Sequence, residues 1–171
     1  MEIVKNNMNT ILSVIGGLAI VAVVVMIVMS DPGSKKASDS TFDKNDENRP
    51  VAVLSTKKID WGEINLNDVK ESEVELTNEG NSPLEIKGLS TSCGCTVVKV
   101  SQNGTETKEY GMHEPLKNKV SIESKSLVKL KIIYRPYVMP VEGAVTRQVF
   151  IETNDPVNPK LEISASAVVK K

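Results

Sequence analysis

The chain has 171 residues and carries 21 basic against 22 acidic side chains, which gives a formal net charge of −1. This length allows one ordinary domain and an additional segment. The near-neutral balance provides no broad positive field for phosphate groups, so it excludes a nucleic-acid partner of the usual electrostatic kind.

The additional segment comes first. Residues 11–29, ILSVIGGLAIVAVVVMIVM, carry no charge, and as a helix they would span about 28 Å, close to the hydrocarbon thickness of a bilayer. The alternative is a buried core helix, but such a helix normally keeps a polar face. The stretch is longer than a secretory hydrophobic region, and neither a clear cleavage site nor a lipid-accepting cysteine follows it. The pattern predicts a retained transmembrane anchor that holds the protein in a membrane.

A short tail, residues 1–10, precedes this anchor and a long polar part follows it, which is the usual arrangement of a signal anchor. Lysines lie on both sides of the span, so the positive-inside rule does not decide its orientation. We expect a cytoplasmic N-terminus and a periplasmic or extracellular domain at the cell envelope. Residues 30–50 are rich in Asp, Ser, Lys and Asn, and they bury too little to repay their ordering entropy, so they are predicted to be a flexible linker.

From residue 51 to residue 171 the hydrophobic period becomes two. In 127–135, LVKLKIIYR, apolar side chains alternate with basic ones, and 71–78 and 160–168 alternate in the same way. Turn residues separate the alternating runs. The pattern predicts an all-β antiparallel sandwich of seven to nine strands, with two facing sheets, behind a single transmembrane helix. The expected strands are 51–54, 57–61, 70–78, 84–89, 96–100, 119–123, 127–135, 144–153 and 160–168.

Residues 101–118, SQNGTETKEYGMHEPLKN, have no clean period and are expected to form a long hairpin or loop that projects from one end of the sandwich. Long loops are disproportionately functional, although many are simple insertions. Tyr110, Met112 and His113 are therefore candidate contacts for a protein partner. A solvated loop histidine is the competing interpretation of His113.

Several motifs occur in a fixed order along this domain: IDWGEI (59–64), VELTNEGNSPLEI (74–86), STSCGCT (90–96), LKIIYRP (130–136) and ETNDPVNPKLEISASAV (152–168). Together they resemble the bacterial domain-of-unknown-function family 1573, which is similar in turn to the ASPM/SPD-2/Hydin and PapD-like β-sandwiches. The resemblance implies a seven-stranded Ig-like fold, often behind a signal or anchor segment, and no established catalytic activity. The insertion 101–118 departs from the family pattern, so whatever it binds would be particular to this protein.

The only two cysteines of the chain, Cys93 and Cys95, flank one glycine. Residues two apart in a strand lie at the upper limit for a disulfide, and Gly94 allows the backbone to tighten. A structural pair or two small packed side chains is the first interpretation. A soft-metal site for copper is the second, with His113 and a methionine as further ligands. Thiol–disulfide exchange is a third, although the usual redox motif has two intervening residues.

Other patterns favour structure over chemistry. Trp61 lies at an inward strand position, the Asn103-Gly104 pair indicates a turn, and residues 153–156, TNDP, indicate an Asx-turn at a strand end. Residues 134–137, YRPY, offer an aromatic and basic contact point, but a proline there also ends a strand. We find no GxSxG, GxGxxG, P-loop or HExxH pattern.

The sequence therefore predicts a non-catalytic binding or scaffolding module at the envelope, and we expect it to act as an accessory subunit of a larger assembly. It binds the membrane through residues 11–29 and one or more proteins through its loops or an open sheet edge. No cofactor and no small-molecule ligand is expected. The alternative function is copper or thiol-redox handling through Cys93 and Cys95.

Overall fold

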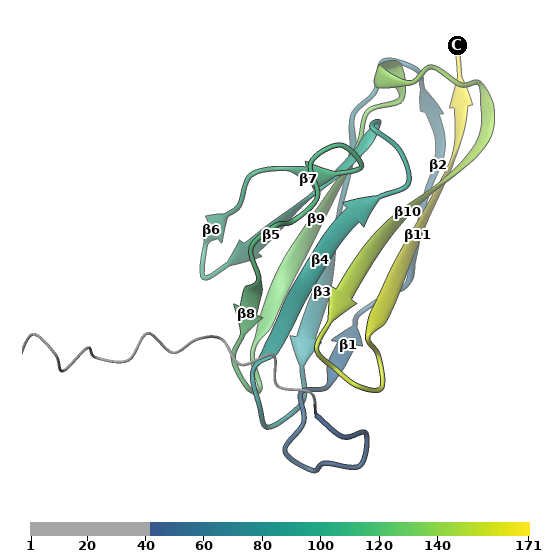
Figure 1. Ribbon diagram of the computed structural model, residues 1–171. Helices are drawn as coiled ribbons and strands as arrows, with labels where there is room; N and C mark the ends of the chain where they lie inside the picture. The colour runs from purple at the N-terminus through teal and green to yellow at the C-terminus, as the bar shows by residue number, and fades with distance from the viewer. Residues whose placement is uncertain (1–41) are drawn as a thin grey trace, which may run out of the picture. The chain divides into compact units, whose positions relative to one another are not determined.

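The computed structural model describes residues 42–171, which form two stacked β-sheets (Figure 1). One sheet has the order β1-β3-β9-β5-β6, with β7 paired to β5, and the other has the order β2-β11-β10-β4-β8. The strands are β1 (Ala52–Leu54), β2 (Lys58–Asn65), β3 (Lys70–Asn78), β4 (Leu84–Thr91), β5 (Thr96–Gln102), β6 (Thr105–Glu106), β7 (Tyr110–Gly111), β8 (Val120–Ile122), β9 (Leu127–Tyr134), β10 (Gly143–Thr153) and β11 (Lys160–Lys170). A short 3₁₀ helix, η1 (Pro136–Val138), follows β9.

The predicted tail 1–10, the predicted anchor 11–29 and the first part of the predicted linker lie outside the described residues. Within 42–171, no helix has the length and the apolar character needed to cross a bilayer.

The predicted all-β fold is confirmed, and each of the nine expected strands has a counterpart. The Asn-Gly turn is confirmed as well: Asn103 and Gly104 both have positive φ and connect the paired residues Gln102 and Thr105. One pairing differs from the antiparallel expectation, because β2 runs parallel to β11. The chain crosses from one sheet to the other between β1 and β2, and this crossing brings β2 alongside the last strand.

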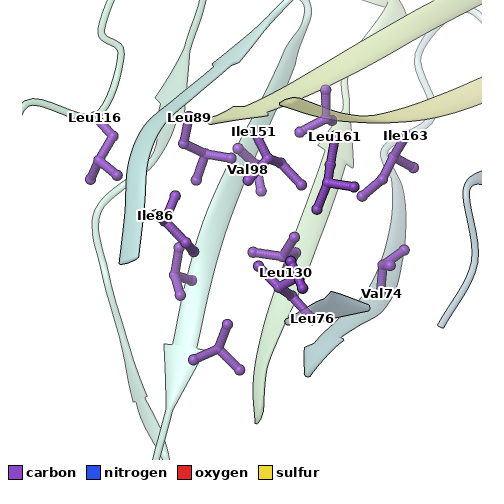
Figure 2. Packing of buried hydrophobic residues seen from close by; sticks show 14 of the residues in the cluster. Val74, Leu76, Ile86, Leu89, Val98, Leu116, Leu130, Ile151, Leu161 and Ile163 are labelled. Atoms are coloured by element: carbon purple, nitrogen blue, oxygen red, sulfur yellow. The ribbon is translucent and has the colours of Figure 1, made fainter. Parts of the chain in front are cut away.

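The inward positions of the strands form the main core between the sheets (Figure 2). The side chains predicted to face inward are buried, since Val74, Leu76, Leu130 and Ile163 are all 0% exposed. One-sided alternation therefore placed the core correctly. Each fully buried Leu or Ile contributes on the order of 2 kcal/mol of transfer free energy.

The insertion forms a hairpin, which was one of the two expected forms, but it folds back along the sandwich and does not project as a free loop. It first continues β5 as a hairpin with β6 and then folds back, where β7 pairs with β5. Leu116 is 7% exposed and belongs to the main core, and its N–H donates to the carbonyl oxygen of Leu89 on β4 (3.0 Å). The insertion thus covers the side of the sandwich between β4 and β5, where Leu116 lies in the main core and Tyr110 packs against it.

The last part of the predicted linker is also attached to the domain, so residues 43–50 belong with the sandwich. Arg49 Nη1 lies 2.9 Å from Asp155 Oδ1, and Pro50 is buried. The polar composition that predicted a linker does not reveal this contact, because the partner of Arg49 lies 106 residues away.

Asp155, from the TNDP motif, is 0% exposed and collects four donors. It accepts the N–H of Ala52 (3.0 Å), the N–H of Val157 (3.0 Å), the amide of Asn158 (3.0 Å) and the Arg49 guanidinium. Burial alone would raise the pKa of this carboxyl, but the hydrogen bonds and Arg49 outweigh it, so the pKa lies below its usual value. The predicted Asx-turn is therefore present, and its carboxylate also holds the start of β1.

We expect Asp155→Asn to lower the free energy of unfolding by about 2–3 kcal/mol at pH 7, because it removes a buried acceptor and the partner of Arg49. A carboxyl with a lowered folded pKa stabilises above its unfolded pKa of about 4, and the contribution is lost as pH falls through the folded value. The difference in the free energy of unfolding between wild type and variant should therefore become smaller below about pH 4. Urea unfolding of the full chain at pH 7 and at low pH measures it.

Asp43→Asn is the matched control, because Asp43 is exposed and accepts only the N–H of Asn45 in an Asx-turn that asparagine also forms. A gap that stays constant down to low pH would contradict the assigned role of the Asp155 charge.

Candidate functional site

The two cysteines lie in the turn that carries the chain from β4 of one sheet to β5 of the other. They form a disulfide, with Cα atoms 5.3 Å apart, so the first interpretation of the pair, a structural bridge, describes this structure. The side chains are 6% and 2% exposed. Both cysteines belong to a second apolar cluster at this end of the sandwich.

Two threonines hold the turn around the disulfide. Thr91 Oγ1 accepts the N–H of Met112 (3.0 Å) and lies 2.9 Å from the carbonyl oxygen of Cys93 and 2.8 Å from that of Thr96. The Thr96 hydroxyl lies 3.4 Å from Cys93 Sγ, and it is the donor because a bridged sulfur carries no hydrogen. The insertion and the disulfide turn are thus joined through buried hydroxyl groups.

The second cluster also holds an aromatic stack. The rings of Trp61 on β2 and Tyr134 on β9 are parallel within 8°, with centroids 5.4 Å apart, and the Arg147 guanidinium lies 5.8 Å from the Tyr134 ring centroid. Trp61 packs against both clusters, so its predicted core role is confirmed. Two buried polar atoms here, Tyr134 Oη and Arg147 Nε, have no hydrogen-bond partner among the described residues.

His113 lies against the backbone of Gly94, where a Cβ would meet its Nε2 at 3.1 Å. A shallow hollow beside it, of about 210 Å³, is lined in part by Thr96, Glu109 and Met112. The structure therefore brings His113 to the cysteine turn, but both sulfurs are already bonded to each other. Among residues 42–171 no group of three or more His, Cys, Asp or Glu side chains is placed to hold a metal ion. Copper binding through Cys93, Cys95 and His113 stays a prediction, and it would first require reduction of the bridge.

The other two candidates from the insertion differ in exposure. Met112 is 54% exposed, whereas Tyr110 is half-buried against the main core. Glu109 accepts two hydrogen bonds from the Arg135 guanidinium (2.7 and 3.0 Å), and this contact lowers the pKa of the Glu109 carboxyl. Only Met112 is thus available as an apolar contact for a partner.

A more prominent apolar surface lies in the connection between β9 and β10. Tyr137, Val138, Met139 and Val141 are each between 45% and 48% exposed, and we call residues 137–141 the apolar loop. Arg135, just before it, donates its N–H to the carbonyl oxygen of Cys95 (2.8 Å), so the loop lies at the disulfide end. Of the predicted contact residues 134–137, Tyr134 and Pro136 are buried and Tyr137 is exposed.

Sequence reasoning missed Val138, Val141 and Arg147 as functional candidates. A signal for the apolar loop was present, since YVMPV between two strands leaves large side chains where turns are normally polar. For Arg147 the signal was weaker: the residue falls in the inward register of an apolar strand, between Val145 and Val149.

Comparison with known proteins agrees with the resemblance seen in the motifs. Residues 52–114 match the family model described as Protein of unknown function (DUF1573). A search of curated proteins found no match to the chain.

Three solved structures illustrate the fold. A protein of unknown function from Porphyromonas gingivalis W83 is 20% identical with a TM-score of 0.56, over 72% of this chain and 49% of its own length. The ASH/PapD-like domain of human CEP192 is 15% identical with a TM-score of 0.49, over 81% of this chain and 99% of that domain. The periplasmic chaperone SfaE is 11% identical with a TM-score of 0.45, over 71% of this chain and 58% of its own.

The chain spans about half the length of the P. gingivalis protein, 49%. This likeness supports the β-sandwich fold, and at such identities none of the three carries an activity or a ligand over to this chain.

The disulfide closes a very short loop, so we expect its removal to weaken the domain without unfolding it. The double variant Cys93→Ala, Cys95→Ala should lose about 2–3 kcal/mol, of which the cross-link contributes about 1.5 kcal/mol and the lost sulfur packing the rest. This loss corresponds to roughly 5–10 °C in the melting temperature of the full chain. Failure of the variant to fold at 25 °C would contradict a local role. Intact mass before and after reduction, with a difference of two hydrogens, is the control that the bridge is formed.

Proposed function

We propose that this chain, which carries a DUF1573 domain in residues 52–114, is a membrane-anchored, exported, non-catalytic binding or scaffolding module at the cell envelope, and that it acts as an accessory subunit of a larger assembly. The observation that carries the binding function is the apolar loop. Four large apolar side chains, close together in the sequence and nearly half exposed, are unusual on a monomeric surface and are typical of a contact site.

The charges around the loop favour a protein over an anionic lipid surface as the partner. Arg135 is paired with Glu109, Lys171 with Glu142, and Lys70 with Asp68. Apart from Arg147, a single half-buried cation, these pairs leave no excess of positive charge near the loop among residues 42–171, whereas a peripheral site on anionic lipid normally has a cluster of basic residues. An apolar centre with a neutralised polar rim is the usual anatomy of a protein interface.

The position of the loop in the fold agrees with this function. Residues 43–50 join the sandwich beside Asp155, at the end opposite to η1 and the disulfide turn (Figure 1). A chain held from its N-terminal side would therefore present the apolar loop away from the point of attachment. A buried disulfide also suits an oxidising compartment outside the cytosol.

The localisation of the domain outside the cytosol can be tested first. We expect protease added to intact cells or spheroplasts to digest the domain, because an exported domain lies on the outer side of the membrane. A tag at the C-terminus, read by immunoblot, measures it, and a cytosolic protein is the control for leakage. A domain that resists protease until lysis would contradict export.

The apolar loop can be tested by a matched pair of variants. Val138→Ser together with Met139→Ser should lower the amount of cross-linked partner recovered with the tagged full chain by about tenfold, as expected for loss of an interface anchor. The control is Val157→Ser, because Val157 is as exposed as Val138, 48% in each case, and lies beside Asp155 at the other end.

Equal losses in the two variants would indicate that recovery depends on general surface hydrophobicity and would contradict the assignment. Thermal unfolding of each variant shows whether the fold is retained.

A further inference from the structure

Among residues 42–171, one half of β10 has no strand neighbour on one side. β10 pairs with β11 from Gly143 to Glu152, but it pairs with β4 only from Val149 onward. β4 ends at Thr91, where the chain leaves for the other sheet through the disulfide turn. The last contact on this side is between Gln148 and Ser92, whose N–H donates to the Gln148 carbonyl oxygen (3.0 Å). We call residues 143–147 the open segment of β10.

The open segment leaves strand hydrogen-bonding groups without a strand partner. The N–H and the carbonyl oxygen of Gln148 both face the β4 side, where Ser92 binds them. Backbone groups two residues apart face the same side, so those of Thr146 and Ala144 face it too. Both residues are exposed, and within the described part of the chain the one hydrogen bond to these groups on that side is donated by Arg147 Nη1 to the Thr146 carbonyl oxygen (3.1 Å). Such an edge is a template for an added strand.

Arg147 supplies a charge at the same place. It occupies an inward position, half-buried, with its guanidinium beside the Tyr134 ring. Its Nε is buried without a hydrogen-bond partner, and it forms no ion pair with a carboxylate of residues 42–171. Every other arginine of the described chain has one: Arg49 pairs with Asp155 and Arg135 with Glu109. An unpaired, partly desolvated guanidinium is a receptor for a carboxylate.

The apolar loop leads directly into the open segment. Val141 precedes it by two residues and is 46% exposed. Backbone donors and acceptors, an unpaired cation and apolar side chains thus occur together. Backbone hydrogen bonds and side-chain contacts bind an extended peptide at a sheet edge, and the cation adds a site for an acidic side chain.

We propose that the open segment of β10 is a strand-addition site for an extended segment of a partner protein that carries an acidic side chain. Ala144 and Thr146 provide the backbone hydrogen bonds, Arg147 binds the carboxylate, and the apolar loop packs against the flanking side chains of the segment. This inference rests on the proposed binding function and names its site and the chemistry of its partner.

The same features have an opposite explanation, and the two explanations predict opposite effects of removing Arg147. An inward charge at a sheet edge can serve to prevent edge-to-edge pairing. In that case removal of Arg147 would promote association, including that of a second copy of this chain. If Arg147 is a receptor, its removal weakens binding.

The probe is a fluorescein-labelled peptide, Val-Thr-Val-Glu-Val-Thr with blocked ends, and its partner with Gln in place of Glu. Fluorescence anisotropy with the purified full chain should show the acidic peptide binding about tenfold more tightly, as expected for a partly desolvated ion pair. In Arg147→Gln the two peptides should bind equally. Lys129→Gln is the control, because Lys129 is an exposed cation on the other sheet, already paired with Glu73.

Hydrogen exchange on the same samples should show slower exchange of the amides of Ala144 and Thr146, which face the open side, when the acidic peptide is bound. Equal affinity of the two peptides for wild type, absence of binding up to about 1 mM, or protection elsewhere would overturn the proposal. Light scattering that shows a dimer in Arg147→Gln but not in wild type would also overturn it, in favour of the protective role.

Photo-crosslinking in intact cells separates this inference from the proposed function. The full chain carries p-benzoylphenylalanine at position 146, at position 138, or at position 73 as a control on the outer face of the other sheet. Cross-links from position 146 to a segment that contains Asp or Glu, lost in Arg147→Gln, support strand addition. Cross-links from position 138 alone leave the binding function standing and refute the edge site. The absence of cross-links from all three positions refutes both.

Discussion

The turn that transfers the chain between the two sheets is the constraint on which the disulfide end depends. β4 belongs to one sheet and β5 to the other, and only four residues, 92–95, connect Thr91 to Thr96. A connection this short must leave its own sheet at once. β4 therefore cannot continue along β10, and the first part of β10, residues 143–147, has no neighbouring strand on that side within the described chain.

The composition of this turn follows from the same constraint. A sharp crossing buries its own backbone, and buried carbonyl groups need donors. Thr91 approaches two of these carbonyl oxygens with its hydroxyl, and the Arg135 N–H binds that of Cys95. The disulfide then fills the space beneath the turn with sulfur, next to Tyr134 and Val145. The two cysteines therefore stabilise the turn by apolar packing as well as by cross-linking it, since the cross-link closes so short a loop that it gives little entropic stabilisation.

The opposite end of the sandwich is closed by buried polar side chains. Asn78 is 0% exposed; its Oδ1 accepts the N–H of Gly80 (3.0 Å), and its amide donates to the carbonyl oxygens of Ser82 (2.9 Å) and Ile122 (3.1 Å). Gly80 has to be glycine, because a Cβ there would lie 2.3 Å from the carbonyl oxygen of Arg49. Together with Asp155, Asn78 provides hydrogen-bond partners for backbone groups of the loops at the end where residues 43–50 join the domain.

The sequence predicted what depends on neighbouring residues and missed what depends on distant ones. Period-two alternation located the strands, because one-sided burial imposes it residue by residue. The Asn103-Gly104 turn was predictable for the same local reason. The attachment of Arg49 to Asp155 and the unpaired edge of β10 were not, since each is decided by strand order and by where β4 ends. The insertion was misjudged because its two apolar contacts with the core, Tyr110 and Leu116, give no periodic signal.

The two ends of the domain thus solve the same problem in different ways, and the difference bears on function. At the Asp155 end, polar groups are paired inside the fold, so little remains to attract a partner. At the disulfide end, the crossing turn consumes the hydrogen-bonding capacity of β4 and leaves that of β10 unused, while the apolar loop remains partly in water. Stability alone would favour a longer β4 and a polar loop. Within residues 42–171, the disulfide end keeps an unpaired guanidinium, an open sheet edge and four exposed apolar side chains, and the proposed contact with another chain would account for all three.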